Sequence, residues 1–223
     1  MAAVASLGDE TRRKLFAFIA SAEAPVGRDD AAGALGLPRS TASFHLDRMV
    51  HDGLLTVEFR KLGGREGPGS GRPAKLYRAG VQEVAASVPE RNYDLAAELL
   101  VGAIEESATA GVPARAALLR SAYARGKAAA DGKGFAAFAE LLSAEGYRPE
   151  DDGAGGLVLL NCPFHRIASG HADVVCAMNG AFLGGAAAGC GVAPDCVEAL
   201  DIEELRAGGA ARPGQCCARI RPA

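Results

Sequence analysis

The chain has 223 residues, of which 49% are hydrophobic, 23% charged and 5% aromatic, and its formal net charge is −3. This length is enough for one large domain or two small ones, and the hydrophobic share excludes wholesale disorder. No apolar run approaches the roughly 20 residues of a membrane span, and the N-terminal residues lack the basic and apolar blocks of a secretory signal. We therefore expect a soluble, cytoplasmic protein without a membrane partner.

Charge and cysteine are distributed unevenly along the chain. Residues 1–80 contain 12 Lys and Arg against 9 Asp and Glu, a net charge of +3, whereas residues 81–223 contain 12 against 18, a net charge of −6. A basic front and an acidic rear are expected where only the front meets a polyanion. All 6 cysteines follow residue 161. In a cytoplasmic protein this clustering favours metal, cluster or redox chemistry over a disulfide framework.

The first 80 residues predict three helices followed by two strands. Apolar residues at helical spacing predict a helix over residues 5–22 and a second over 28–35, which Gly36 closes. Pro38 suits the first position of a third helix, which should stop at Gly53. The residues expected on its buried face are Phe44, Leu46, Met49 and Val50.

Two strand-like runs follow the third helix, at residues 54–62 and 73–79. The segment between them, residues 63–72, holds five glycines and a proline and is expected to be a hairpin loop. Three helices followed by a β-hairpin, with a short break before the third helix, is the pattern of a winged helix-turn-helix.

Polar and basic residues gather on the third helix and the hairpin of this pattern. A helix in the major groove presents its first turns to base edges and phosphates, and a basic hairpin contacts the sugar-phosphate backbone. Because one such module covers few base pairs, we expect a homodimer on a double-stranded DNA operator. The expected DNA-binding residues are Arg39, Ser40, Thr41, Ser43, His45 and Arg48 on the helix and Arg60, Lys61, Arg65, Arg72 and Lys75 on the hairpin.

The rest of the chain predicts helices and then short strands, which indicates an α+β domain. The expected helices cover residues 84–110, 113–131, 134–147 and 171–189, the last weakened by its glycines, and the expected strands cover 156–161, 195–200 and 215–220. The predicted domains are a winged helix-turn-helix at 1–82, a helical linker or dimerisation segment at 83–150 and a cysteine-containing sensor domain at 151–223.

Spacing limits which cysteines can share one site. In a continuous helix, Cys190 would lie about 21 Å along the axis from Cys176, which is too far for one small cluster. Cys196 lies in a turn-like stretch that nothing ties to the others. Adjacent side chains of a strand point to opposite faces, so only one of Cys216 and Cys217 is expected to face the site.

The best candidate ligand set is therefore Cys162, Cys176 and one of Cys216 or Cys217, with His165 as a fourth ligand. Cysteine thiolates hold iron–sulfur clusters, with histidine as an occasional substitute, and tetrahedral zinc accepts the same ligand types. These residues alone do not decide between an iron–sulfur cluster and a zinc ion as the bound group.

Two sets of motifs resemble known regulators. The segments LGDETRRKLFAFI, AAGALGLPRSTASFHLDRMVHDGLL and GRPAKLYR are similar to winged-helix regulators of the ArsR and DeoR type. That front, followed by NCPFH, VCxMN and a C-terminal GxCC, resembles the SufR-like regulators of iron–sulfur cluster assembly. The resemblance implies a repressor whose Cys162, Cys176 and Cys216 or Cys217 bind a [2Fe–2S] or [4Fe–4S] cluster and sense iron–sulfur or redox status.

Two other functions stay open at this point. The same DNA-binding module could respond to zinc or to a small organic effector, with structural cysteines, because free cysteine is often simply a buried small hydrophobe. The rear domain could also be a redox or ligand-processing enzyme fused to a winged helix. No nucleophile–base pair, paired catalytic carboxylates or phosphate-binding loop stands out, so we expect no enzymatic activity.

Overall fold

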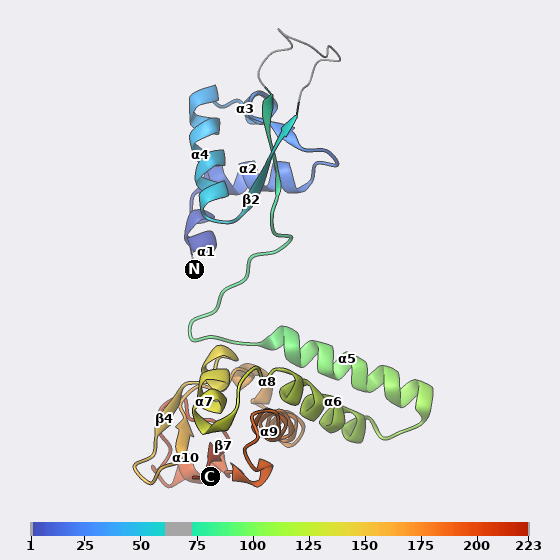
Figure 1. The fold of residues 1–223 in the computed structure, drawn as a ribbon, viewed down its shortest axis with the longest axis vertical. Helices are drawn as coiled ribbons and strands as arrows, with labels where there is room; N and C mark the ends of the chain where they lie inside the picture. Colours follow the sequence, from blue (N-terminus) through green and yellow to red (C-terminus); the bar gives the residue numbers. More distant parts are fainter. Residues whose placement is uncertain (1, 61–72, 223) are drawn as a thin grey trace. The chain divides into compact units, whose positions relative to one another are not determined.

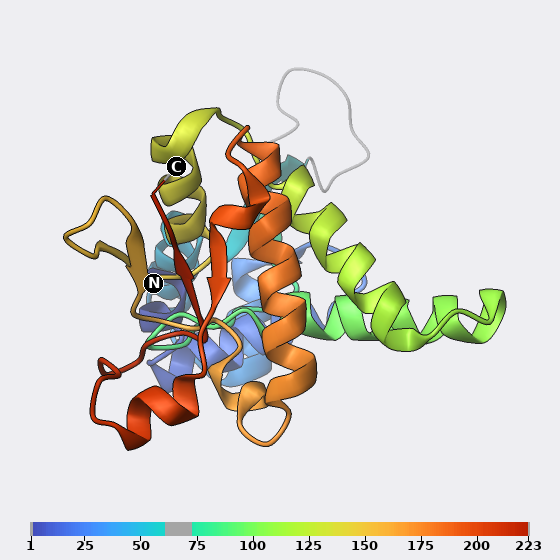
Figure 2. The same ribbon diagram turned by 90° about the horizontal axis from the view of Figure 1, so that it is seen from below.

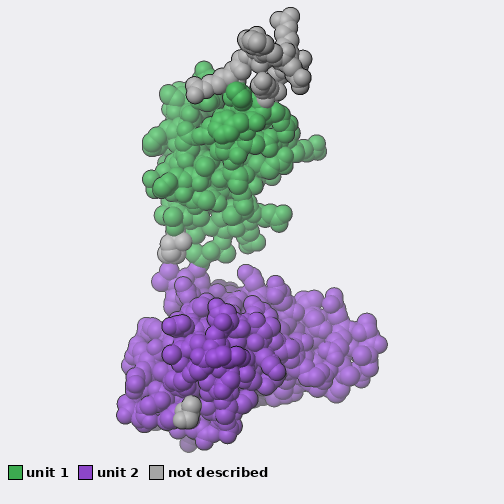
Figure 3. All heavy atoms as spheres, viewed as in Figure 1, with its two compact units in different colours: residues 1–86 green, residues 87–223 purple. Residues whose placement is uncertain are grey.

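The computed structural model describes residues 2–60 and 73–222 and has a mixed α+β fold. The chain divides into two compact units, residues 1–86 and 87–223 (Figures 1 and 3). The first boundary is close to the predicted one at residue 82. No second boundary separates 83–150 from 151–223, because helices from both segments share one hydrophobic core.

The first unit combines helices with a three-stranded antiparallel sheet of strand order β1-β3-β2. In this sheet Tyr77 of β3 lies opposite Val26 of β1 and Val57 of β2. The short β1 was not predicted, because two residues carry no periodic pattern. The elements are α1 (Ala2–Ser6), α2 (Glu10–Ala20), β1 (Val26–Gly27), α3 (Arg28–Leu35), α4 (Arg39–His51), β2 (Leu55–Arg60) and β3 (Ala74–Ala79).

Local signals explain the helix ends of this unit. The helix predicted over 5–22 is interrupted, because the side chain of Asp9 accepts a hydrogen bond from the Arg12 N–H at 2.9 Å and starts α2 afresh. Gly36 closes α3 in the left-handed region at φ 63°, where glycine carries little steric cost. The predicted third helix is α4, within one or two residues at each end.

The core of the first unit explains why α4 lies where it does. Ala42, Leu46 and Met49 follow one another on the buried face of α4 and pack with the other core side chains of the unit. The expectation that Phe44 belongs to this face is wrong. Its side chain is 66% exposed, because it lies two residues from Ala42 and from Leu46, on the opposite side of the helix.

The second unit combines seven helical segments among its described residues with a four-stranded antiparallel sheet of strand order β4-β5-β7-β6. Its first helix begins at an Asn92 cap rather than at residue 84. The elements are α5 (Tyr93–Ala110), α6 (Ala114–Ala128), α7 (Gly134–Ala144), β4 (Pro149–Asp151), β5 (Leu157–Leu159), α8 (His165–Ala168), α9 (Ala172–Gly189), the 3-10 turn η1 (Pro194–Cys196), β6 (Val197–Ala199), α10 (Ile202–Ala207) and β7 (Ala218–Ile220).

Glycines hold α9 against α6, and Figure 2 shows the two helices side by side, α9 in orange and α6 in yellow-green. A Cβ atom on Gly126 would lie 2.0 Å from the Phe182 carbonyl oxygen, and one on Gly185 would lie 2.0 Å from the Tyr123 carbonyl oxygen. The glycines that weaken α9 as an isolated helix therefore allow this close packing. Length and composition alone would let α9 cross a membrane, and 44% of this helix is buried within its unit.

Candidate functional site

Strand pairing brings the distant cysteines of the second unit together. Strands β5 and β7 are antiparallel neighbours, with Leu157 opposite Ile220. Cys162 follows β5, and Cys216 and Cys217 precede β7, so the pairing places the end of one strand beside the beginning of the other. The Cys216 N–H donates to the Leu159 carbonyl at 2.8 Å and extends this pairing toward the thiols.

Four thiols meet at this point, those of Cys162, Cys176, Cys216 and Cys217, and they are named the thiol cluster. The Cys216 thiol interacts with the thiols of Cys162 and Cys217, and Cys217 also interacts with Cys176, which lies in the first turns of α9. All four are free cysteines. Within residues 2–60 and 73–222, no group of three or more His, Cys, Asp or Glu side chains has the arrangement that would hold a single metal ion.

The expectation that only one of Cys216 and Cys217 faces the site is wrong. The alternation of side chains applies within a strand, and β7 begins only at Ala218. Both cysteines lie in the irregular segment before it, so the backbone can turn both thiols toward Asn179.

Hydrogen bonds among the thiols divide them into two that favour the thiolate and two that favour the thiol. Hydrogen bonds from Cys176 and Cys216 lower the pKa of Cys217 to about 3, and a hydrogen bond from Cys216 lowers the pKa of Cys162. The pKa of Cys176 and the pKa of Cys216 are raised, first because these thiols donate to their neighbours and then because burial disfavours the charged form. The thiolate is the metal-binding form of cysteine, so the lowered pKa values of Cys162 and Cys217 favour binding of a cationic group by the thiol cluster.

A buried amide orients the thiol cluster. Asn179 is 1% exposed, and its Nδ2 donates to the Cys216 Sγ at 3.3 Å and approaches the Cys217 Sγ at 3.9 Å. The Tyr147 hydroxyl donates to the Asn179 Oδ1 at 2.5 Å, which keeps the NH₂ group of the amide toward the sulfurs. Neither residue was predicted to belong to the site. Asn179 ends the VCxMN motif, and an Asn three residues after Cys176 in an apolar helix shares a face with that cysteine.

His165 and three of the four thiols line one cavity of about 160 Å³. His165 is exposed at the start of α8, and its backbone N–H donates to the Cys162 carbonyl at 3.1 Å. The short helix α10, which was not predicted, supplies Ile202, Glu203 and Arg206 to the lining of this cavity. Small solutes can therefore reach Cys162, Cys176 and Cys217 through the cavity, whereas Cys216 is buried and does not line it.

Cys190 and Cys196 lie apart from the thiol cluster. Cys190 ends α9 and has Lys133 and Asp131 as its charged neighbours, and Cys196 lies in η1 beside Asp195. Burial raises the pKa of both thiols, as expected for cysteines that pack as small hydrophobic side chains.

The residues expected to bind DNA lie partly on the exposed side of α4. Arg39 and Ser40 are exposed, whereas Thr41 and Ser43 are partly buried. The Arg39 Nε lies 2.6 Å from the Asp29 carboxylate, and the Arg48 Nε lies 3.0 Å from the Asp52 carboxylate. His45 is partly buried, with a buried Nδ1 that has no hydrogen-bond partner, so its ring is not simply presented to solvent.

The hairpin residues have different surroundings. Arg60 pairs with Glu58 at 2.8 Å and remains largely exposed. The Lys75 ammonium lies 2.5 Å from the Asp47 carboxylate and over the Tyr77 ring, so it braces β3 against α4 and is not an unpaired cation. The other expected hairpin contacts, Lys61, Arg65 and Arg72, lie outside the described residues.

Comparison with known proteins finds no family model and no curated protein that matches this chain.

Proposed function

We propose that this chain is a homodimeric DNA-binding repressor whose thiol cluster holds an iron–sulfur cluster and senses iron–sulfur or redox status. The observation that carries the proposal is the meeting of four thiols from three separate parts of the second unit. The second unit contains all six cysteines, and its fold brings four of them to one place while Cys190 and Cys196 lie elsewhere. Four adjacent thiols are the number of ligands that an iron–sulfur cluster usually has.

The first unit supports DNA binding through its element order. The order α2, β1, α3, α4, β2, β3 with a three-stranded antiparallel sheet agrees with a winged helix-turn-helix, in which α3 and α4 are the helical pair and β2 and β3 the wing. In this proposal Arg39 and Ser40, at the start of α4, contact base edges or phosphates. The exposed ring of Phe44 supplies an apolar contact of the kind that recognises the thymine methyl group.

The thiol cluster fits an iron–sulfur cluster by the chemistry of its donors. Cysteine thiolates are the usual ligands of such clusters, and hydrogen bonds to sulfur together with burial set the reduction potential. When bound, the cluster would supply reversible one-electron chemistry and sensitivity to iron supply. The four cysteines would hold the group, the Asn179 amide orients two of them, and apolar side chains surround them on the side of the core. His165 is the alternative ligand at the cavity mouth.

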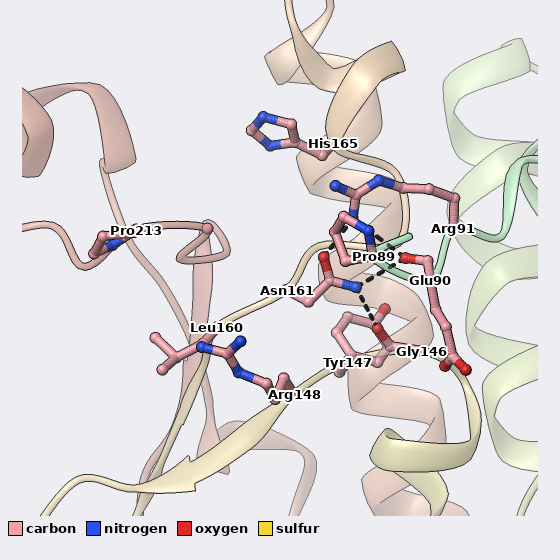
Figure 4. Close-up of a pocket in the computed structure, with 11 residues that line it drawn as sticks. Pro89, Glu90, Arg91, Gly146, Tyr147, Arg148, Leu160, Asn161, His165 and Pro213 are labelled. Carbon is pink, nitrogen blue, oxygen red and sulfur yellow. Dashed lines mark hydrogen bonds between the residues drawn. The ribbon is translucent and has the colours of Figure 1, made fainter. Parts of the chain in front are cut away.

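Hydrogen bonds join the thiol cluster to the segment that leads into the second unit. The Arg91 Nη1 donates to the Cys162 carbonyl at 3.0 Å. It also donates to the Asn161 side-chain oxygen, and the Asn161 Nδ2 donates to the Glu90 carbonyl at 2.8 Å (Figure 4). A change in ligation at Cys162 therefore acts on residues 90 and 91, a few residues after the boundary between the units. This is the proposed route from sensing to DNA binding.

The proposed dimer uses the helices that begin the second unit. On α5, Val101 is 54% exposed and Ile104 is 63% exposed, an unusual exposure for two large apolar side chains one turn apart. A second copy that covers this face would bring two first units to one operator.

The test is anaerobic reconstitution of the full chain, followed by absorbance spectra, iron, sulfide and zinc analysis, and DNA titration with and without the bound group. We expect iron and sulfide in comparable amounts, visible charge-transfer absorption and an operator affinity that depends on the cluster. A colourless protein that takes up only zinc would favour the zinc-responsive alternative.

DNA recognition is tested separately with Arg39→Ala and Arg60→Ala. If Arg39 touches a base edge, its loss weakens specific binding by roughly 1–3 kcal/mol. Loss of Arg60, a proposed phosphate contact, weakens binding to operator and scrambled duplex alike and flattens the salt dependence. Unchanged affinity of both variants on both duplexes would contradict the winged-helix assignment.

A further inference from the structure

A second cavity of about 390 Å³ lies in the second unit and shares His165 with the cavity beside the thiols. Its walls come from four segments that are distant in sequence, residues 89–91, 146–148, 160–161 and 213–214, with His165 at one side (Figure 4). Its volume is within the range of about 300–1,000 Å³ that is usual for small-molecule sites.

Basic side chains dominate the charge of this cavity. Arg91 and Arg148 both line it, and Figure 4 shows them on different sides of Asn161. The one acidic lining residue, Glu90, extends past Gly146 and away from Asn161 (Figure 4). The cavity therefore presents cationic groups around a half-open space, which attracts anions.

Arg91 is held in position before any ligand arrives. Its Nη1 donates to the carbonyl oxygens of Glu90 at 3.2 Å and Cys162 at 3.0 Å, and also to the side-chain oxygen of Asn161. A guanidinium whose Nη1 is already held by hydrogen bonds loses little conformational freedom when its other nitrogens bind an oxyanion.

Among the described residues, the one counter-ion of Arg148 is shared with Arg212. The Arg148 Nε lies 3.4 Å from one oxygen of Glu150, while the Arg212 Nη2 lies 2.8 Å from the other oxygen. One carboxylate between two guanidinium groups leaves a net positive charge at this edge of the cavity. Arg212 does not line the cavity, whereas Arg148 does.

We propose that this cavity binds a small multivalent oxyanion, a metabolite with phosphate or carboxylate groups, between Arg91 and Arg148. Arginine suits both groups because its planar fork matches two oxygens at once. The ligand would contact residues 89–91, which follow the boundary between the units, so it would act as an effector on the same segment that Cys162 contacts. Binding itself requires neither DNA nor an iron–sulfur cluster, so this proposal can fail or hold independently of the proposed function.

The test is calorimetric titration of the metal-free full chain with inorganic phosphate, pyrophosphate and citrate at constant ionic strength. We expect saturable binding of at least one probe with a Kd below about 1 mM. Tighter binding of pyrophosphate assigns a phosphorylated ligand, and tighter binding of citrate assigns a polycarboxylate, so either order supports the site.

Arg148→Gln and Arg212→Gln form a matched pair, because both remove a guanidinium from Glu150 but only Arg148 lines the cavity. We expect Arg148→Gln to weaken binding about tenfold and Arg212→Gln to change it less than about twofold. Absence of saturable binding by all three probes up to about 10 mM, or equal affinities of the wild type and Arg148→Gln, would overturn the proposal.

Discussion

The hydrogen bond from Tyr147 to Asn179 can be tested by removing one hydroxyl. Tyr147→Phe preserves the ring and its packing but leaves the Asn179 Oδ1 without its 2.5 Å donor, in a residue that is 1% exposed. A buried acceptor that loses its donor costs about 1–3 kcal/mol. We expect the free energy of unfolding of the second unit to fall by that amount.

A second substitution distinguishes this hydrogen bond from ordinary packing. Asn179→Leu removes the amide, so in the double variant Tyr147→Phe and Asn179→Leu no unsatisfied oxygen remains. The double variant should therefore lose less stability than the sum of the two single losses, by about 0.5–3 kcal/mol. Tyr123→Phe, at a tyrosine whose side chain is partly exposed, is the control and should change stability by less than about 0.5 kcal/mol.

Hydrogen exchange of the α9 amides in the metal-free full chain measures these changes, because it reports the opening of the second unit without a contribution from the first. Additivity of the two substitutions within about 0.3 kcal/mol would refute the reasoning, since it would mean that the two side chains do not depend on each other. In the reconstituted protein, the same variants should shift the reduction potential, because the Asn179 amide donates to the Sγ of Cys216, a proposed ligand.

Three further outcomes are expected. Serine at any position of the thiol cluster should abolish iron and sulfide uptake in anaerobic reconstitution, whereas serine at Cys190 or Cys196 should leave it intact. Gly185→Ala should destabilise the second unit by roughly 1–3 kcal/mol in thermal unfolding, because its Cβ would lie 2.0 Å from a carbonyl oxygen. Gly180→Ala on the same helix should stabilise the unit, because a Cβ at that position meets nothing within 4 Å. Burial acts to raise the pKa of Asp47, but hydrogen bonds from β3 outweigh it and lower that pKa. In urea unfolding, Asp47→Asn should therefore be less stable than the wild type above the unfolded-state pKa of about 3.9. The difference should vanish as the pH falls through the folded-state pKa.

Local sequence signals predicted most of the helices and strands. The helix that ends at Gly36 and the one that follows Pro38 were located to within two residues, because these signals need no tertiary contact to act. The start of α5 was misplaced because residues 84–92 continue the helical pattern of apolar residues. Pro89 interrupts it, and Asn92 offers a side-chain oxygen that accepts from the Leu95 N–H.

The interior of the candidate site could be predicted only in part, because its contacts are long-range. Nothing near Tyr147 in the sequence indicates that its hydroxyl meets a residue 32 positions later on α9. The exclusion of Cys190 as a ligand needed only helix geometry and agrees with its place apart from the four thiols. The choice between Cys216 and Cys217 needed the first residue of β7, and strand boundaries are the least certain feature of a sequence pattern.

The place where the thiols meet follows from how the sheet closes. Strand β5 is central, and its neighbour β7 comes from the far end of the chain, so the last residues before β7 lie beside the first residues after β5. The chain runs from β5 through Cys162 and α8 into α9. The first turns of α9 therefore bring Cys176 back to the end of β5. The thiol cluster thus requires the complete second unit. A chain that ended before Cys216 would lose two of the four sulfurs together with β7, whose pairing with β5 positions Cys162.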